Sequence, residues 1–340
     1  MASRGVRLVC AVSFLVLVVM MRSTAAVEFW PVPPMYDDAG RPKAITYSAK
    51  RIITLAPSLT ELVYAAGAHG QLVGVSAYSN FPEGATDKPQ VADATGVSIE
   101  ALLALQPDLV LAWKGGTRPA DIARLESLGL NVFVIDIRWL ADVPRALRTI
   151  GKLTGRPNID NTPERVSVTF ESKLQMLQMA NKDKAPVRVF FEISQMPLMT
   201  INGQHFISET IKLCGGVNVF SDVAQVVLEP SREALLQRGA DVILRPASIH
   251  NDVARDKALY SGLAAYGSNR VYAVNADWIL RPGPRVLLAA GEICKALDLR
   301  GPVWLWTRDN LALKASSPHE CADSWQNAAC LCWSILGRCR

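Results

Sequence analysis

A segment that predicts a short helix, a turn and a buried strand occurs twice in the chain. The first copy spans 98–111 (SIEALLALQPDLVL) and the second spans 231–244 (SREALLQRGADVIL). Their matching glutamates, Glu100 and Glu233, are 133 residues apart. Each copy begins with serine, which favours a helix N-terminus, and each strand opens with aspartate. The repeat predicts two lobes of like architecture.

Around both copies, short apolar runs alternate with amphipathic stretches. The runs predict strands and the stretches predict helices. Alternation of this kind is typical of parallel sheets covered by helices. In the first half we expect strands at 51–55, 73–75, 108–112 and 131–135, with helices at 57–66, 99–105 and 120–128; in the second half, strands open at Arg188 and Asp241 and another covers 271–274.

Residues 140–183 are rich in helix formers, and 164–181 predict one long helix. A single helix between the lobes at 51–139 and 184–300 would make a stiff connection, so we expect no large hinge closure. The predicted fold class is α/β, with two Rossmann-like lobes built on parallel sheets and joined by a long interlobe helix.

The N-terminus predicts export. Arg4 and Arg7 precede the apolar run 8–21, and small residues follow at 23–26, as in a secretory signal peptide over 1–26. A Pro-rich, irregular leader is expected at 27–50, and the mature protein is expected to be soluble and periplasmic. The net charge is +5, with three arginines and no acid in 1–26. The near-neutral remainder argues against a nucleic-acid partner.

The seven cysteines fall in three places. Cys10 lies in the signal segment, whereas Cys214 and Cys294 lie in the body, either as two buried thiols or as a bridge of the kind that export permits. The segment 301–340, a Cys- and Trp-rich tail to which we assign no role, holds the other four, Cys321, Cys330, Cys332 and Cys339.

Motifs for catalysis are missing from the sequence. It has no G-x-S-x-G elbow, P-loop, H-E-x-x-H or C-x-x-C, and its four histidines are scattered. We therefore expect no enzyme, no catalytic residue, no metal site and no cofactor.

Aromatic and polar residues instead follow the predicted strands. In open parallel sheets, ligands bind beyond the carboxyl ends of strands. Aromatic rings there suit a large, flat, partly apolar ligand, and a Gly-Gly pair would let the backbone approach it. The residues are Tyr78 and Phe81, then Trp113, Lys114, Gly115 and Gly116, then Asp277, Trp278 and Arg281.

Glu100 and Glu233 each fall in the first turn of a predicted helix, where the helix dipole alone favours a carboxylate. As a matched pair in two similar lobes, they would also fit a two-fold partner with basic pockets.

Several motifs resemble one known family, the periplasmic substrate-binding proteins of ATP-driven importers, in the class with a rigid interlobe helix (class III). The likeness covers about 51–298 and is strongest to the members that bind corrinoids. The motifs are RIITLAPS at 51–58 with TEL at 60–62, AYSNFP at 77–82, LQPDLV at 105–110, AWKGG at 112–116, LCGGVNVF at 213–220, SRE at 231–233 and DWILR at 277–281.

The resemblance implies that a corrinoid, vitamin B12 or a precursor, is captured between the lobes and delivered to a membrane ABC permease. Glu100 and Glu233 would dock on permease arginines, and Cys214 and Cys294 would form a disulfide. We expect the protein to act as a monomer. The implied ligand-binding residues are Tyr78, Trp113, Gly115, Gly116, Asp277, Trp278, Ile279, Leu280 and Arg281.

Two departures from the family leave the ligand open. Val226, Val227 and Leu228 stand where the family has a pocket tryptophan, and 193–200 has Ile and Met where the family is richer in Phe. The alternatives are a haem or ferric-siderophore binder of the same class, for which Tyr78 could be an axial ligand, and a secreted enzyme on a chelatase-like two-lobed scaffold.

Overall fold

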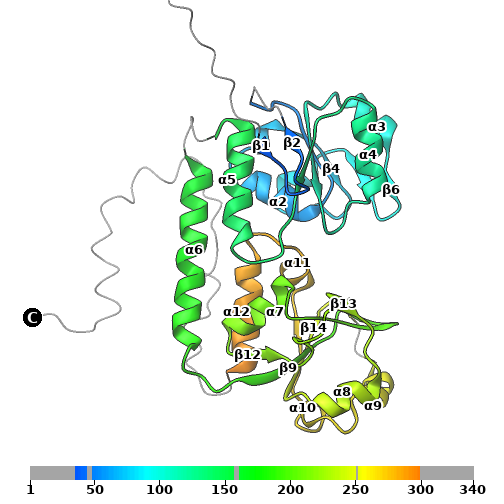
Figure 1. Cartoon of the computed structure of the whole chain (residues 1–340), viewed down its shortest axis with the longest axis vertical. Coiled ribbons are helices and arrows are strands. Elements are labelled where there is room, and N and C mark those ends of the chain that lie inside the picture. The colour runs from blue at the N-terminus through cyan, green and yellow to red at the C-terminus, as the bar shows by residue number, and fades with distance from the viewer. Residues whose placement is uncertain (1–34, 44–47, 157–160, 250–251, 299–340) are drawn as a thin grey trace, which may run out of the picture.

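The computed structural model describes residues 35–43, 48–156, 161–249 and 252–298. These residues form two lobes, each built on a parallel sheet, with a long helix beside both (Figure 1). The predicted signal segment 1–26, the tail 301–340 and the five cysteines within them lie outside the described residues. Within the described residues, no helix combines the length and the apolar character that a membrane crossing requires.

The N-terminal lobe has a six-stranded sheet in the order β6-β5-β4-β3-β7-β8, parallel except where β6 pairs with β5. The central strands read as unbroken apolar runs because helices cover both faces. The strands are β3 (Ile52–Thr54), β4 (Leu72–Ser76), β5 (Gln90–Asp93), β6 (Gly96–Val97), β7 (Leu109–Trp113) and β8 (Val132–Ile135), and the helices are α2 (Pro57–Ala65), η1 (His69–Gln71), η2 (Glu83–Ala85), α3 (Ile99–Ala104) and α4 (Pro119–Ser127).

The C-terminal lobe repeats this core. Its parallel sheet has the order β12-β9-β14-β15, which matches β4-β3-β7-β8 strand for strand, so the predicted duplication of architecture is confirmed. The strands of this sheet are β9 (Val187–Phe191), β12 (Gly216–Asn218), β14 (Val242–Pro246) and β15 (Val271–Val274). A small antiparallel sheet is formed by β10 (Ser194–Gln195), β11 (Leu198–Ile201) and β13 (Val227–Leu228). The helices are α7 (Phe206–Leu213), α8 (Arg232–Arg238), α9 (Val253–Tyr260), α10 (Ala264–Gly267), α11 (Ala276–Ile279) and α12 (Val286–Leu297).

The Arg and Asp residues that open the repeated strands meet in the same way in both lobes. The carboxylate of Asp108 accepts the Arg51 amide at 3.0 Å, and that of Asp241 accepts the Arg188 amide at 3.1 Å. In the second lobe the Arg188 side chain also binds Asp241 at 2.9 Å, and its hydrogen bonds hold the pKa of Asp241 below the ordinary value. The aspartates therefore satisfy amide groups at the start of each sheet.

The interlobe helix is α6 (Thr162–Asn181), which spans about 30 Å at 1.5 Å per residue. It packs against α5 (Asp142–Thr154) of the first lobe and α7 of the second. Arg148 on α5 ties the two long helices together, with ion pairs to Glu164 at 2.6 Å and Glu171 at 2.7 Å. The connection thus consists of packed helices rather than a loose linker.

The leader is less irregular than expected. Two short strands, β1 (Met35–Tyr36) and β2 (Pro42–Lys43), form an antiparallel hairpin on the N-terminal lobe. Arg41 binds Asp37 at 2.6 Å and Glu126 on α4 at 2.7 Å. An irregular segment was expected, but the described part of the leader at 35–43 is this hairpin, held by charged contacts and by Met35 packing against the main core; 27–34 and 44–47 lie outside the described residues.

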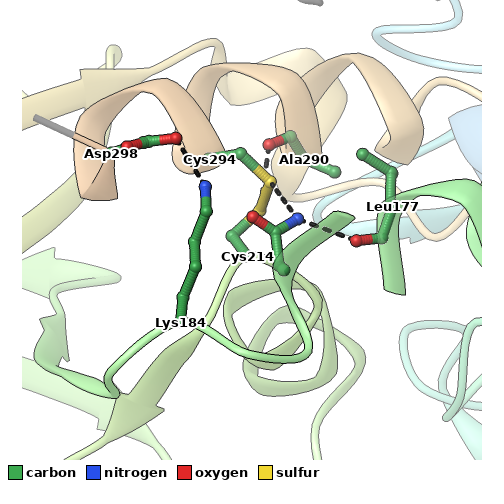
Figure 2. Close-up of a disulfide and its surroundings, with 7 residues drawn as sticks. Leu177, Lys184, Cys214, Ala290, Cys294 and Asp298 are labelled. Atoms are coloured by element: carbon green, nitrogen blue, oxygen red, sulfur yellow. Dashed lines mark hydrogen bonds and ion pairs between the residues drawn. A yellow bond between two sulfur atoms is a disulfide. The ribbon is translucent and has the colours of Figure 1, made fainter. Parts of the chain in front are cut away.

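The disulfide between Cys214 and Cys294, implied by the family resemblance, is confirmed. Figure 2 shows the bridge beneath α12, where it joins the end of α7 to this helix. Both cysteines are buried, and their Cα atoms are 4.6 Å apart. Nearby, Lys184 pairs with Asp298 at 2.5 Å, so the start of β9 and the end of α12 are fastened at the same place.

Candidate functional site

The loop after β4 presents Tyr78 to solvent. Tyr78 has a backbone φ of +63°, and the residue is 75% exposed. The next residue, Ser79, is buried and its hydroxyl bonds to that of Thr60 on α2 at 3.0 Å, and Thr60 in turn bonds to Thr54 of β3 at 2.7 Å. A buried chain of hydroxyl groups therefore anchors the loop, and Tyr78 stays exposed.

The stretch from Asp277 to Arg281 lies on and after α11, at the junction between the lobes (Figure 1). The side chain of Asp277 is 39% exposed and Leu280 is 40% exposed. Trp278 is half-buried against the main core, and Ile279 is fully buried. The ligand contacts expected of these five residues stay a prediction, and Ile279 packs its side chain into the core.

Polar contacts bring these two segments together across the junction. Asn80 donates to Asp277 at 3.0 Å, and Arg281 donates to the Asn80 side-chain oxygen at 2.7 Å. Arg281 also binds Asp277 at 2.6 Å. Tyr78 and the exposed part of 277–281, more than 190 residues apart in the chain, thus belong to one surface.

The Trp113 ring folds back on the turn that follows β7, so a Cβ added at Gly115 would stand 2.8 Å from the indole, and one added at Gly116 would overlap it. The two glycines therefore make room for the Trp113 ring. Both glycines are exposed, and the ligand contacts expected of them and of Trp113 stay predictions. Trp113 is half-buried against the core, and among the described residues no polar contact ties it to the Tyr78 loop or to Arg281.

Three residues at the junction escaped the sequence analysis as functional residues in their own right: Glu61, Asn80 and Arg285. Glu61 is 4% exposed and stands among buried residues of α2. A buried acid on the apolar side of a helix requires a cationic partner. The position of Glu61 among the apolar residues of the predicted helix could therefore have indicated a buried ion pair. Its partners, Arg281 and Arg285, come from the other lobe.

Two pockets lie apart from the contacts of Glu61 with Arg281 and Arg285. One, of about 390 Å³, is lined by 90–93, 95–98 and Arg118 at the edge of the first sheet. The other, of about 890 Å³, lies beside α6 and α7 and is lined by residues that include Trp139, Glu209 and Lys212. Burial raises the pKa of Glu209, which accepts the Leu140 amide at 2.6 Å and so makes a second contact between the lobes.

Glu100 and Glu233 both lie exposed in the first turns of α3 and α8. Ser231 caps α8 by accepting the Ala234 amide at 3.1 Å, whereas Ser98 makes no such side-chain bond. Figure 1 shows α3 in one lobe and α8 in the other, both away from α6. The matched positions of the two acids therefore hold in three dimensions.

Comparison with known proteins gives the family. The profile described as "Periplasmic binding protein" matches residues 52–277, which cover both lobes and α6. The chain belongs to the periplasmic binding proteins. The resemblance seen in the motifs is thereby confirmed, and the family is one of binding proteins.

Among the relatives of this periplasmic binding protein are vitamin B12-binding proteins. That of Vibrio cholerae is 33% identical over 253 residues, covering 74% of this chain and 91% of the relative. That of Pectobacterium atrosepticum is 35% identical over 253 residues, covering 73% and 88%.

Solved structures agree on the fold. The periplasmic vitamin B12-binding protein BtuF of Vibrio cholerae has a TM-score of 0.66 at 33% identity, covering 73% of this chain and 96% of that structure. The haem-binding protein BhuT has a TM-score of 0.64 at 23% identity, covering 74% and 100%. At that lower identity the likeness to BhuT shows a shared fold alone.

Proposed function

We propose that this periplasmic binding protein captures a corrinoid, vitamin B12 or a precursor, at the lobe junction and delivers it to the permease of an ABC importer. The observation that carries the proposal is the 33–35% identity to vitamin B12-binding proteins over 88–91% of their length. The export signal expected at 1–26 and the family support a periplasmic location for the mature protein.

In this proposal, the ligand meets one aromatic face and a polar rim. Tyr78 is exposed on an anchored loop, Asp277 and Arg281 of the other lobe hydrogen-bond to Asn80 of that loop, and Leu280 between them is exposed. Burying a flat apolar surface against an aromatic ring provides the attraction, and the charged rim orients the ligand's polar side groups. Nothing is turned over, so the protein serves as a carrier.

The ligand is tested by calorimetric titration of the purified mature protein with cyanocobalamin, cobinamide and haemin. We expect the two corrinoids to bind and Tyr78→Ala to weaken them about tenfold. Tyr36→Ala is the matched control, since Tyr36 is 65% exposed on the leader hairpin, away from the junction. Binding of haemin without either corrinoid would contradict the proposal and favour the haem alternative.

We propose further that Glu100 and Glu233 dock on basic pockets of the permease. Their exposure and equivalent placement in the two lobes support this role. Reversing both to Lys should leave corrinoid affinity intact and abolish uptake in a reconstituted transport assay. Asp183→Lys, an exposed change after the end of α6, should leave uptake unchanged. Normal transport by the double variant would refute docking without affecting the ligand assignment.

A further inference from the structure

Glu61 is a buried carboxylate whose cationic partners both come from the opposite lobe. Its side chain is 3% exposed, in the middle of α2. Arg285 donates through Nε to Oε2 at 2.8 Å and through Nη2 to Oε1 at 2.5 Å. Arg281 donates to the same Oε1 at 3.2 Å. A buried carboxylate is tolerated when it is paired in this way, so the lobes are joined by charge as well as by α6.

Each of these arginines also holds part of the candidate site. Arg281 binds the Asn80 side-chain oxygen at 2.7 Å and thereby reaches the loop that carries Tyr78. Arg285 lies over the Phe81 ring, with its guanidinium carbon 4.1 Å from the centroid, a cation–π contact with the same loop. Glu61 thus binds both arginines, and both arginines contact the 78–81 loop.

We infer that Glu61 and Arg285 are positioning residues of the binding site, which hold Arg281 and the Tyr78 loop at a fixed separation across the lobe junction. The inference rests on the proposed function in taking these two elements as ligand contacts. Glu61 and Arg285 themselves are 3% and 13% exposed, so they act through their neighbours rather than on a ligand. Both faces of the site are therefore set before a ligand arrives.

Loss of the Glu61 charge has a definite consequence. The guanidinium groups of Arg281 and Arg285 would stay close together without the anion between them, and like charges in a partly buried place repel. The 78–81 loop and the 277–281 stretch would then sample several separations. A ligand would have to order them on binding, which lowers affinity without removing any direct ligand contact.

The test measures the separation of the lobes without ligand. Nitroxide labels on non-natural residues at exposed Ala123 in α4 and Lys257 in α9 avoid the cysteines and report interlobe distances by pulsed electron resonance. We expect one narrow distribution for the native sequence. Glu61→Gln should broaden it and weaken cyanocobalamin binding at least tenfold in calorimetry.

Glu209→Gln is the matched control. Glu209 is also an acid at a contact between the lobes, but the hydrogen bond that its carboxylate accepts among the described residues comes from the Leu140 amide, and an amide oxygen can still accept it. It should leave both the distances and the affinity within twofold of the native protein. Arg285→Lys keeps the charge but loses the paired hydrogen bonds, so it should broaden the interlobe distance distribution less than Glu61→Gln does. It takes the place of Glu61→Gln if that variant does not fold.

An unchanged, narrow distribution in Glu61→Gln, or in Arg285→Lys where that stands in, would overturn the inference. So would equal broadening in Glu209→Gln, since it would mean that any lost charge at the junction has the same effect. The distances need no ligand, so they decide the inference even if neither cyanocobalamin nor cobinamide binds the native protein, an outcome that would refute the proposed function alone.

Discussion

The disulfide between Cys214 and Cys294 gives a quantitative prediction. The bridge closes a loop over a sequence separation of 80, which contains β12, β14 and β15, three of the four strands of the C-terminal sheet. Restricting the unfolded chain by a loop of this length contributes about 4.5 kcal/mol at 25 °C in the chain-entropy treatment. Reduction should therefore lower the free energy of unfolding by roughly that amount, with a fall in Tm of about 10 °C.

Urea unfolding followed by circular dichroism measures this difference with and without reductant. The double variant Cys214→Ala, Cys294→Ala supplies the control, because its stability should not respond to reductant if no other cysteine contributes. Both side chains are buried, at 3% and 0% exposure, so the variant also loses some packing and should be no more stable than the reduced native protein. Equal unfolding midpoints for oxidised and reduced native protein would refute the reasoning.

Three further predictions concern stability. Burial lowers the pKa of His205 to about 4, below its ordinary 6.5, so the free energy of unfolding is full above pH 6.5 and falls by roughly 2–3 kcal/mol as the pH drops to 4.5. His205→Asn, whose side chain can still cap α7, should flatten this pH dependence in urea unfolding. An unchanged pH dependence in the variant would count against the prediction. Gly116→Ala adds a Cβ atom that overlaps the Trp113 ring and should lower the free energy of unfolding by about 1–3 kcal/mol in thermal unfolding. Gly70→Ala, whose added Cβ has nothing within 4 Å, should change stability little. Similar losses of stability in both variants would contradict the packing argument. Glu126→Gln should lower the free energy of unfolding by less than about 1 kcal/mol in the same assay, because its ion pairs with Arg41 and Lys43 are partly exposed. A larger loss would show that these ion pairs stabilise the protein more than exposed pairs do.

The predicted elements of the core match the structure closely. The strand expected at 108–112 is β7 (Leu109–Trp113), and the long helix expected at 164–181 is α6 (Thr162–Asn181). Hydrophobic periodicity and turn residues act within one element, so a single sequence carries enough information to place them. The leader hairpin was missed because its strands have only two residues each and are held by Arg41 and Glu126 through charge.

The candidate site was predicted only in part. The strand ends indicated where Tyr78 and Asp277 would lie, and the structure joins their segments through Asn80. It was not possible to foresee that Ile279 faces the core or that Trp113 covers its own glycines, since both depend on side-chain packing in three dimensions.

The sequence by itself determined the two like lobes and the helix between them, because apolar periodicity and turn residues act within single elements and occur in matching order in both halves. Only the tertiary structure decided which side chains meet between the lobes. Glu61 and Arg285, 224 positions apart, become partners because α6, α5 and α7 pack the lobes in one relative placement. No pattern within a single helix or strand encodes that placement, since it results from the packing of all of them together.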